Sequence, residues 1–175
     1  MAPPIIEFKH DGLVLDACCA INLCVSGQME SILRIIPVRV AIAEYVAEVE
    51  VRECNLRPFI SNELLTVIEV VTEEEAENVV TFATALGGDG EAYTGAIAVS
   101  HNLAIASDER RVLNYFERQA PHLQRLTSPE LVKFWSDTAN PPSHAVSQAL
   151  QAIEQVGNYA VPNRSNCYDW WMAHR

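Results

Sequence analysis

The chain has 175 residues, of which 49% are hydrophobic and 20% are charged. This length suits one compact domain rather than two, and the apolar content excludes a disordered chain because it is enough to form a core. A net charge of −11 argues against a protein that holds nucleic acid by bulk electrostatics. No apolar run is long enough to span a membrane, and the N-terminal stretch MAPPIIEFKH lacks the pattern of a signal peptide.

The charges are unevenly distributed along the chain. Residues 61–100 carry eight acidic side chains and no Lys or Arg, whereas residues 101–175 carry seven of each sign. A polyanion is therefore expected to be steered to the later segment, where Arg110 and Arg111 lie.

The first half of the chain is predicted to alternate between strands and helices. Short apolar or β-branched runs indicate the strands, and apolar residues at helical spacing, ended by Ser26-Gly27 or by Pro37, indicate the helices. In chain order, the predicted elements are a strand over 13–15, helices over 17–25 and 28–36, a strand over 38–42, a helix over 44–53 and a strand over 64–71. The last of these is expected at an edge of the sheet or in a hairpin.

The second half continues the alternation and ends in an irregular tail. Thr72 to Glu75 form a capping box, and Ser128-Pro129 is a typical helix start. In chain order, the predicted elements are helices over 72–86 and 91–100, a strand over 103–106, a helix over 110–118, a strand over 123–126, a helix that begins at Ser128 and a helix over 143–156. The alternation predicts an α/β fold with a mostly parallel central sheet flanked by helices, and ligands in such folds bind at the carboxyl ends of the strands.

Four acidic residues stand where strands lead into helices. Asp16 follows the first strand, Asp108 follows the strand over 103–106, Glu91 begins a helix, and Glu48 lies on the helix over 44–53. Each has an ordinary alternative as a helix cap, a dipole partner or a solvated surface residue. Together they supply the oxygen ligands that a hard cation such as Mg²⁺ requires.

Three segments resemble the PIN-domain family of nucleases. These are LVLDACCAIN (13–22), VAIAEYVAEVE (40–50) and GDGEAYTGAIAVSHNLAIASDERRV (88–112), of which the last resembles the VapC-like toxin branch. The resemblance covers roughly residues 11–135 and implies a three-layer PIN-like nuclease domain. Residues 136–175 are then a C-terminal helical extension with an aromatic tail.

The resemblance also implies the site residues. Asp16, Glu48, Glu91 and Asp108 match the family's catalytic acids, and Asp16, Glu91 and Asp108 are the expected ligands of Mg²⁺ or Mn²⁺. Glu44 competes with Glu48, and the spacing from valine favours Glu48. The sequence departs from the toxin branch at Ser107, where a second Asp is frequent, and at Glu109, where a basic residue is usual.

The function implied is that of a metal-dependent endoribonuclease that hydrolyses RNA phosphodiester bonds in single strands or loops. The branch further implies the toxin of a toxin–antitoxin pair, with an antitoxin protein as partner and a homodimer as the default assembly. We hypothesise that Arg110 and Arg111 clamp the phosphate, against the alternative of an ordinary solvated helix start.

Two other functions compete with the nuclease. One is a non-catalytic PIN-like binding or regulatory module with a degenerate metal site. The other is a phosphate-accepting signalling domain, which is disfavoured because it needs a lysine at the end of a late strand and the chain has only Lys9 and Lys133.

The cysteines and the terminal aromatic residues complete the expectations. The five cysteines are odd in number and lack zinc-type pairs, so we expect reduced thiols in a cytoplasmic protein. Tyr168, Trp170 and Trp171 are expected to dock onto the chain itself, with contact to a partner or stacking on bases as alternatives.

Overall fold

The computed structural model describes residues 6–175, so the first half of the N-terminal stretch discussed above lies outside the described residues. Five parallel strands form one sheet in the order β3-β2-β1-β4-β5, which confirms the predicted α/β fold with a parallel central sheet. The strands are β1 (Gly12–Leu15), β2 (Arg39–Ala43), β3 (Thr66–Ile68), β4 (Ala104–Ala106) and β5 (Arg125–Leu126).

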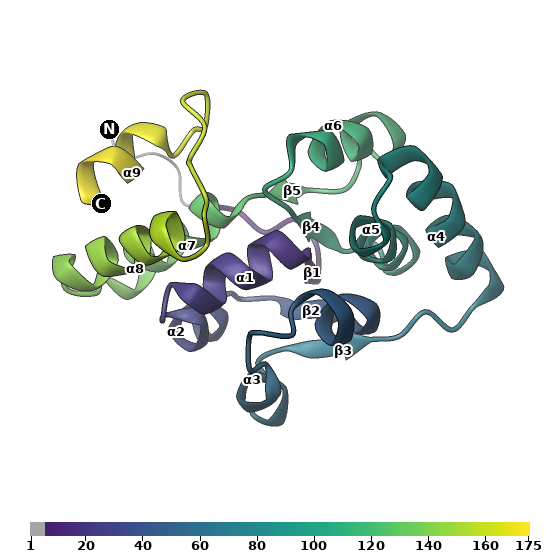
Figure 1. Cartoon of the computed structure of the whole chain (residues 1–175), viewed down its shortest axis with the longest axis horizontal. Helices are drawn as coiled ribbons and strands as arrows, with labels where there is room; N and C mark the ends of the chain where they lie inside the picture. The colour runs from purple at the N-terminus through teal and green to yellow at the C-terminus, as the bar shows by residue number, and fades with distance from the viewer. Residues whose placement is uncertain (1–5) are drawn as a thin grey trace.

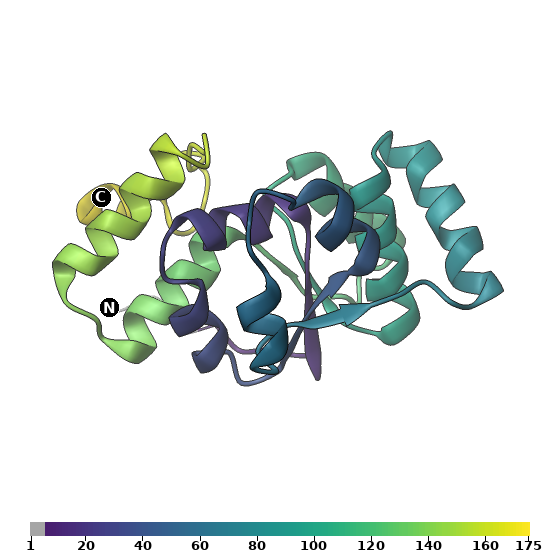
Figure 2. The same ribbon diagram turned by 60° about the horizontal axis from the view of Figure 1, so that its bottom comes forward.

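Helices cover both faces of this sheet, as the three-layer prediction requires (Figure 1). Figures 1 and 2 show α4, α5 and α6 on one side and α1, α2, α7 and α8 on the other. The helices are α1 (Ala17–Val25), α2 (Met29–Ile35), the π-helical segment η1 (Val46–Glu50), α3 (Arg57–Ser61), α4 (Glu73–Leu86), α5 (Asp89–His101), α6 (Arg110–Gln119), α7 (Ser128–Ala139), α8 (Ser143–Gln155) and α9 (Tyr168–His174).

The strand order creates a switch point between β1 and β4. From β1 the chain proceeds through β2 to β3 at one edge, and then returns to β4 and β5 on the other side of β1. The loops that leave β1 and β4 therefore diverge to opposite faces of the sheet, and ligands of such sheets bind in the crevice between them. Asp16 and Ser107 are the residues that follow these two strands.

Close packing between α5 and its neighbours depends on small side chains. Ala92, Ala96 and Ala98 of this helix are fully buried. A Cβ added at Gly95 would overlap the ring of Phe116 on α6, which is itself fully buried. The Ala- and Gly-rich sequence of α5 thus lets its N-terminus, with Glu91, approach the carboxyl end of the sheet.

Several elements differ from their predicted bounds. The helix expected over 44–53 is replaced by a short helical segment whose second part is η1, where the N–H of Val51 bonds to the carbonyl of Val46 at 3.0 Å. The strand over 64–71 is the edge strand β3, parallel to β2. The short helix α3 was not predicted.

The C-terminal tail, predicted to be irregular, contains α9. Trp171 is fully buried there, and its Nε1 donates to Glu154 of α8 at 2.8 Å. The prediction that the terminal aromatic residues dock onto the chain itself is confirmed for Trp171. A helix of seven residues is too short for apolar periodicity to predict it from sequence. Packing of α9 on α8 therefore stabilises its helical structure.

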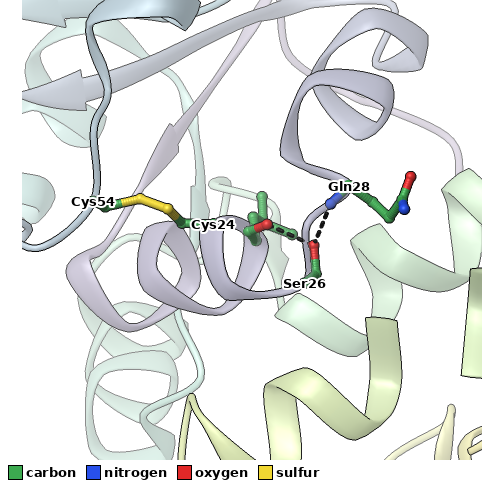
Figure 3. The surroundings of a disulfide bond; sticks show 5 residues. Cys24, Ser26, Gln28 and Cys54 are labelled. Carbon is green, nitrogen blue, oxygen red and sulfur yellow. Dashed lines mark hydrogen bonds between the residues drawn. A yellow bond between two sulfur atoms is a disulfide. The ribbon is translucent and has the colours of Figure 1, made fainter. Parts of the chain in front are cut away.

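The prediction that all five cysteines are reduced is wrong, because Cys24 and Cys54 form a disulfide (Figure 3). Their Cα atoms lie 6.3 Å apart, and the bond joins the end of α1 to the loop after η1. Beside it, Ser26 Oγ accepts a hydrogen bond from the Gln28 N–H at 3.1 Å. The two cysteines are 30 residues apart, so their approach is tertiary and leaves no local motif.

The disulfide also removes one support for the predicted cytoplasmic location, which rested on reduced thiols. Across residues 6–175, no helix is long and apolar enough to cross a membrane.

Candidate metal centre at the carboxyl edge of the sheet

Asp16 is the buried centre of the candidate site. It caps α1 directly after β1, and only 2% of its surface is exposed. Its Oδ1 accepts from the Ala17 N–H at 2.7 Å, and its Oδ2 accepts from the hydroxyl of Ser107 at 2.7 Å. Burial, together with a smaller effect of the charge of Glu91, raises the pKa of Asp16 to about 6.

Ser107 accounts for one departure from the family pattern. This residue follows β4 and is fully buried, and its hydroxyl donates to Asp16. A second carboxylate at this position would repel Asp16 in a buried environment, whereas the hydroxyl holds it in one orientation. The departure therefore keeps the first acid in place.

Glu91 lies in the first turn of α5, and its charge acts on Asp16. Its side chain is 15% exposed, and a Cβ added at Gly88 would overlap its carboxylate. The charge of Glu91 contributes to the raised pKa of Asp16, so the two predicted site acids influence each other electrostatically.

Glu50 is an acid of this group that the sequence analysis missed. It is the last residue of η1, and its carboxylate accepts from the backbone N–H of Gly90, where a Cβ would overlap it. Partial desolvation raises the pKa of Glu50, and the charges of Asp16, Glu91 and Asp89 raise it further. These like charges show that Glu50 lies at the rim of the same cluster.

Glu48, the predicted second acid, lies elsewhere. Its side chain is exposed, its carbonyl accepts from Arg52 Nε at 3.0 Å, and it lines a surface hollow with Val51 and Leu56. Within residues 6–175, Glu44 and Glu48 make no side-chain hydrogen bond or ion pair with the acidic group. The sequence analysis chose Glu48 over Glu44 from its spacing to valine and did not consider Glu50, which ends the π-helical segment η1.

Asp108 is a tether between three elements. Its Oδ1 accepts from the Ser128 N–H at 2.8 Å, and its Oδ2 accepts from Asn22 Nδ2 at 2.8 Å and from the Ser128 hydroxyl. Its own N–H donates to Cys18 Sγ at 3.2 Å. Burial raises its pKa. The carboxylate is thus directed towards α1 and the start of α7, and Cys18 lies between it and Asp16.

The two predicted phosphate-binding arginines begin α6. Arg111 is 56% exposed, and its Nη2 lies 3.4 Å from Glu91 Oε1 and 3.4 Å from Glu109 Oε2. The second departure from the family pattern, Glu109, therefore pairs with an arginine at the edge of the site. Arg110 is exposed and makes no side-chain hydrogen bond or ion pair within the described residues.

A pair of tyrosines stands beside the acids. The rings of Tyr45 and Tyr93 are stacked, with centroids 4.5 Å apart and planes 5° from parallel. Tyr45 Oη donates to Asp89 Oδ2 at 3.3 Å. The sequence analysis did not predict this pair, because Tyr45 directly precedes η1 and Tyr93 lies far along the chain in α5.

The donor set suits a hard divalent cation. Asp16, Glu50 and Glu91 offer only carboxylate oxygens, which Mg²⁺ and Mn²⁺ prefer. Burial first, and the neighbouring acidic charges second, raise the pKa values of Asp16 and Glu50, and a bound cation would offset both effects. The donor chemistry therefore fits the predicted metal, whereas in residues 6–175 the one group of three ligand atoms within 4.8 Å of one another is Cys18, Cys19 and Asp108.

No family model matches the chain, and a search of curated proteins found no significant relative.

Proposed function

We propose that the chain is a Mg²⁺- or Mn²⁺-dependent ribonuclease of the PIN type that hydrolyses phosphodiester bonds in RNA. The observation that carries the proposal is the buried Asp16 at the switch point of a parallel sheet, with Glu91 and Glu50 directing further negative charge at it. Apart from ion binding, a fold gains little from gathering like charges around a buried carboxylate.

Asp16, Glu91 and Glu50 are the proposed ligands of the cation. When bound, such an ion lowers the pKa of a ligated water and stabilises negative charge on phosphate oxygens. In this assignment Glu50 replaces Glu48, and Asp108 fixes the junction of α1, β4 and α7 beside the ligands.

The surrounding residues prepare the ligands and the substrate. Ser107 and the Ala17 N–H hold the Asp16 carboxylate in one orientation. Arg111 neutralises part of the charge of Glu91 and is exposed enough to reach a phosphate instead. Asp16 must be ionised to bind a cation, so activity is expected to rise with pH through about 6.

A toxin–antitoxin role and a homodimer remain part of the proposal, on the resemblance of residues 88–112 to the toxin branch. An antitoxin that covers the site would need basic side chains to face Asp16, Glu50 and Glu91.

Glu50 and Glu48 offer a matched test, because they lie two residues apart and both have exposed side chains. Cleavage of a mixed-sequence single-stranded RNA in Mn²⁺ is expected to fall at least about 100-fold in Glu50→Gln, about 2.7 kcal/mol of transition-state stabilisation. Glu48→Gln is expected to retain the wild-type rate. Loss in Glu48→Gln with full activity in Glu50→Gln would restore the assignment made from sequence.

A non-catalytic binding module is the second candidate. The ion pair of Arg111 with Glu91 and the full hydrogen bonding of Asp108 favour it, because both engage site residues with protein partners. Tight Mn²⁺ binding without turnover of any RNA would select this function.

A further inference from the structure

A second group of ligand atoms lies beside the carboxylate cluster. The thiol of Cys18, the thiol of Cys19 and a carboxylate oxygen of Asp108 all lie within 4.8 Å of one another. Both cysteines are free, Cys19 is buried and Cys18 is partly exposed. The two thiols come from the first turn of α1, and Asp108 comes from the end of β4.

Two hydrogen-bonding contacts and a helix N-terminus meet at this group of atoms. The Asp108 N–H donates to Cys18 Sγ at 3.2 Å, and Cys18 Sγ in turn donates to Asp16 Oδ2. Both sulfurs lie at the N-terminus of a nine-residue helix, where the dipole favours anions. Asn22 and Ser128 donate hydrogen bonds to the Asp108 carboxylate, which is the kind of outer support that metal ligands usually have.

We propose that Cys18, Cys19 and Asp108 bind one borderline divalent cation, of which Zn²⁺ is the type, with water in the fourth position. Two thiolates and a carboxylate suit Zn²⁺ and its tetrahedral geometry, whereas the all-oxygen set of Asp16, Glu50 and Glu91 suits Mg²⁺. Binding forms two Zn–S bonds and releases the two thiol protons to solvent, with no change of oxidation state. Burial raises the pKa of Cys19, so its proton leaves only as the ion enters.

A cation bound by Cys18, Cys19 and Asp108 would lie next to the acidic cluster and affect its metal binding. Cys18 Sγ lies 3.5 Å from Asp16 Oδ2. A cation held by Cys18 would therefore place positive charge close to Asp16 and reduce the affinity of the carboxylate cluster for Mg²⁺. If the proposed nuclease function holds, Zn²⁺ would act as its inhibitor.

The test uses Co²⁺ as a spectroscopic substitute on the full chain, without reductant so that the Cys24–Cys54 disulfide persists. We expect a near-ultraviolet sulfur-to-cobalt charge-transfer band that saturates at one ion per chain. Zn²⁺ should displace the band and excess Mg²⁺ should not. Cys18→Ser and Asp108→Asn are expected to weaken Co²⁺ binding at least about tenfold, while Cys167→Ser, a matched free cysteine, leaves it unchanged.

Two results would overturn the inference: absence of the charge-transfer band in the wild type, or a band with unchanged Co²⁺ affinity in Cys18→Ser. Because Cys19 is buried and its variant could misfold, Asp108→Asn with an unchanged circular dichroism spectrum supplies the second ligand test. The band is recorded without RNA. Its absence would therefore refute the thiolate site alone, and failure of RNA cleavage would leave the thiolate site standing.

Discussion

Replacement of Asp16 by Asn is expected to change how the stability of the chain depends on pH. Burial raises the pKa of this acid from 3.8 to about 6. The raised pKa therefore makes a contribution to the unfolding free energy that is fully present below pH 3.8. This contribution is lost as pH rises through 6. The difference between the two pKa values corresponds to about 3 kcal/mol of unfolding free energy.

The asparagine variant has no carboxyl group at this position, so it does not lose unfolding free energy through ionisation at neutral pH. Its amide can still accept from the Ala17 N–H through Oδ1, and its Nδ2 can donate to the rotated Ser107 hydroxyl, so the packing is preserved. The difference in unfolding free energy, variant minus wild type, is therefore expected to be up to about 3 kcal/mol larger at about pH 8 than at about pH 4.

Urea denaturation in EDTA, at several pH values across this range, measures the comparison. Asp169→Asn, the same substitution at an exposed aspartate, is the matched control. A difference between wild type and Asp16→Asn that stays constant from acid to neutral pH would refute the reasoning. Such a result would mean that Asp16 is not a buried acid with a raised pKa.

Three further changes test other parts of the structure. Joint replacement of Cys24 and Cys54 by Ser opens a loop of about 30 residues and should lower the unfolding free energy by roughly 3–4 kcal/mol in urea denaturation; equal stability of the oxidised and reduced wild type would show that the bond contributes nothing. Gly95→Ala places a methyl group against the Phe116 ring and should cost about 1–3 kcal/mol, measured against the exposed Ser100→Ala on the same helix. Arg111→Ala should weaken RNA binding at least about tenfold, measured by fluorescence anisotropy in Ca²⁺; unchanged RNA affinity and turnover would remove Arg111 from the substrate contacts.

The sequence was sufficient to predict those parts of the fold that depend on local patterns. The apolar run before Asp16 and the run before Ser107 are fully buried strands, and their alternation with helices predicted the parallel sheet. Because the carboxyl ends of parallel strands share one edge, the alternation also predicted that the residues after these two strands lie close together. Glu91 followed from the Gly-rich start of α5.

The remaining features depend on tertiary structure. The residues around Glu48 and Glu50 form a π-helical segment where the sequence predicted a regular helix over 44–53, and apolar spacing does not reveal such a segment. The Cys24–Cys54 pair forms where α1 meets the loop after η1. The direction of the Asp108 carboxylate is set by Ser128, twenty residues later in the chain. None of these contacts has a local sequence signature.

Cleavage of a mixed-sequence single-stranded RNA by the purified chain tests the proposed nuclease most directly. Wild type and Asp16→Asn, prepared identically, would be compared in Mg²⁺, in Mn²⁺ and in EDTA. We predict cleavage by the wild type in either metal, none in EDTA, and a loss of at least about 100-fold in the variant, because the buried ligand charge is removed. Equal cleavage by the two proteins, or no cleavage although Mn²⁺ binds, would contradict the proposal.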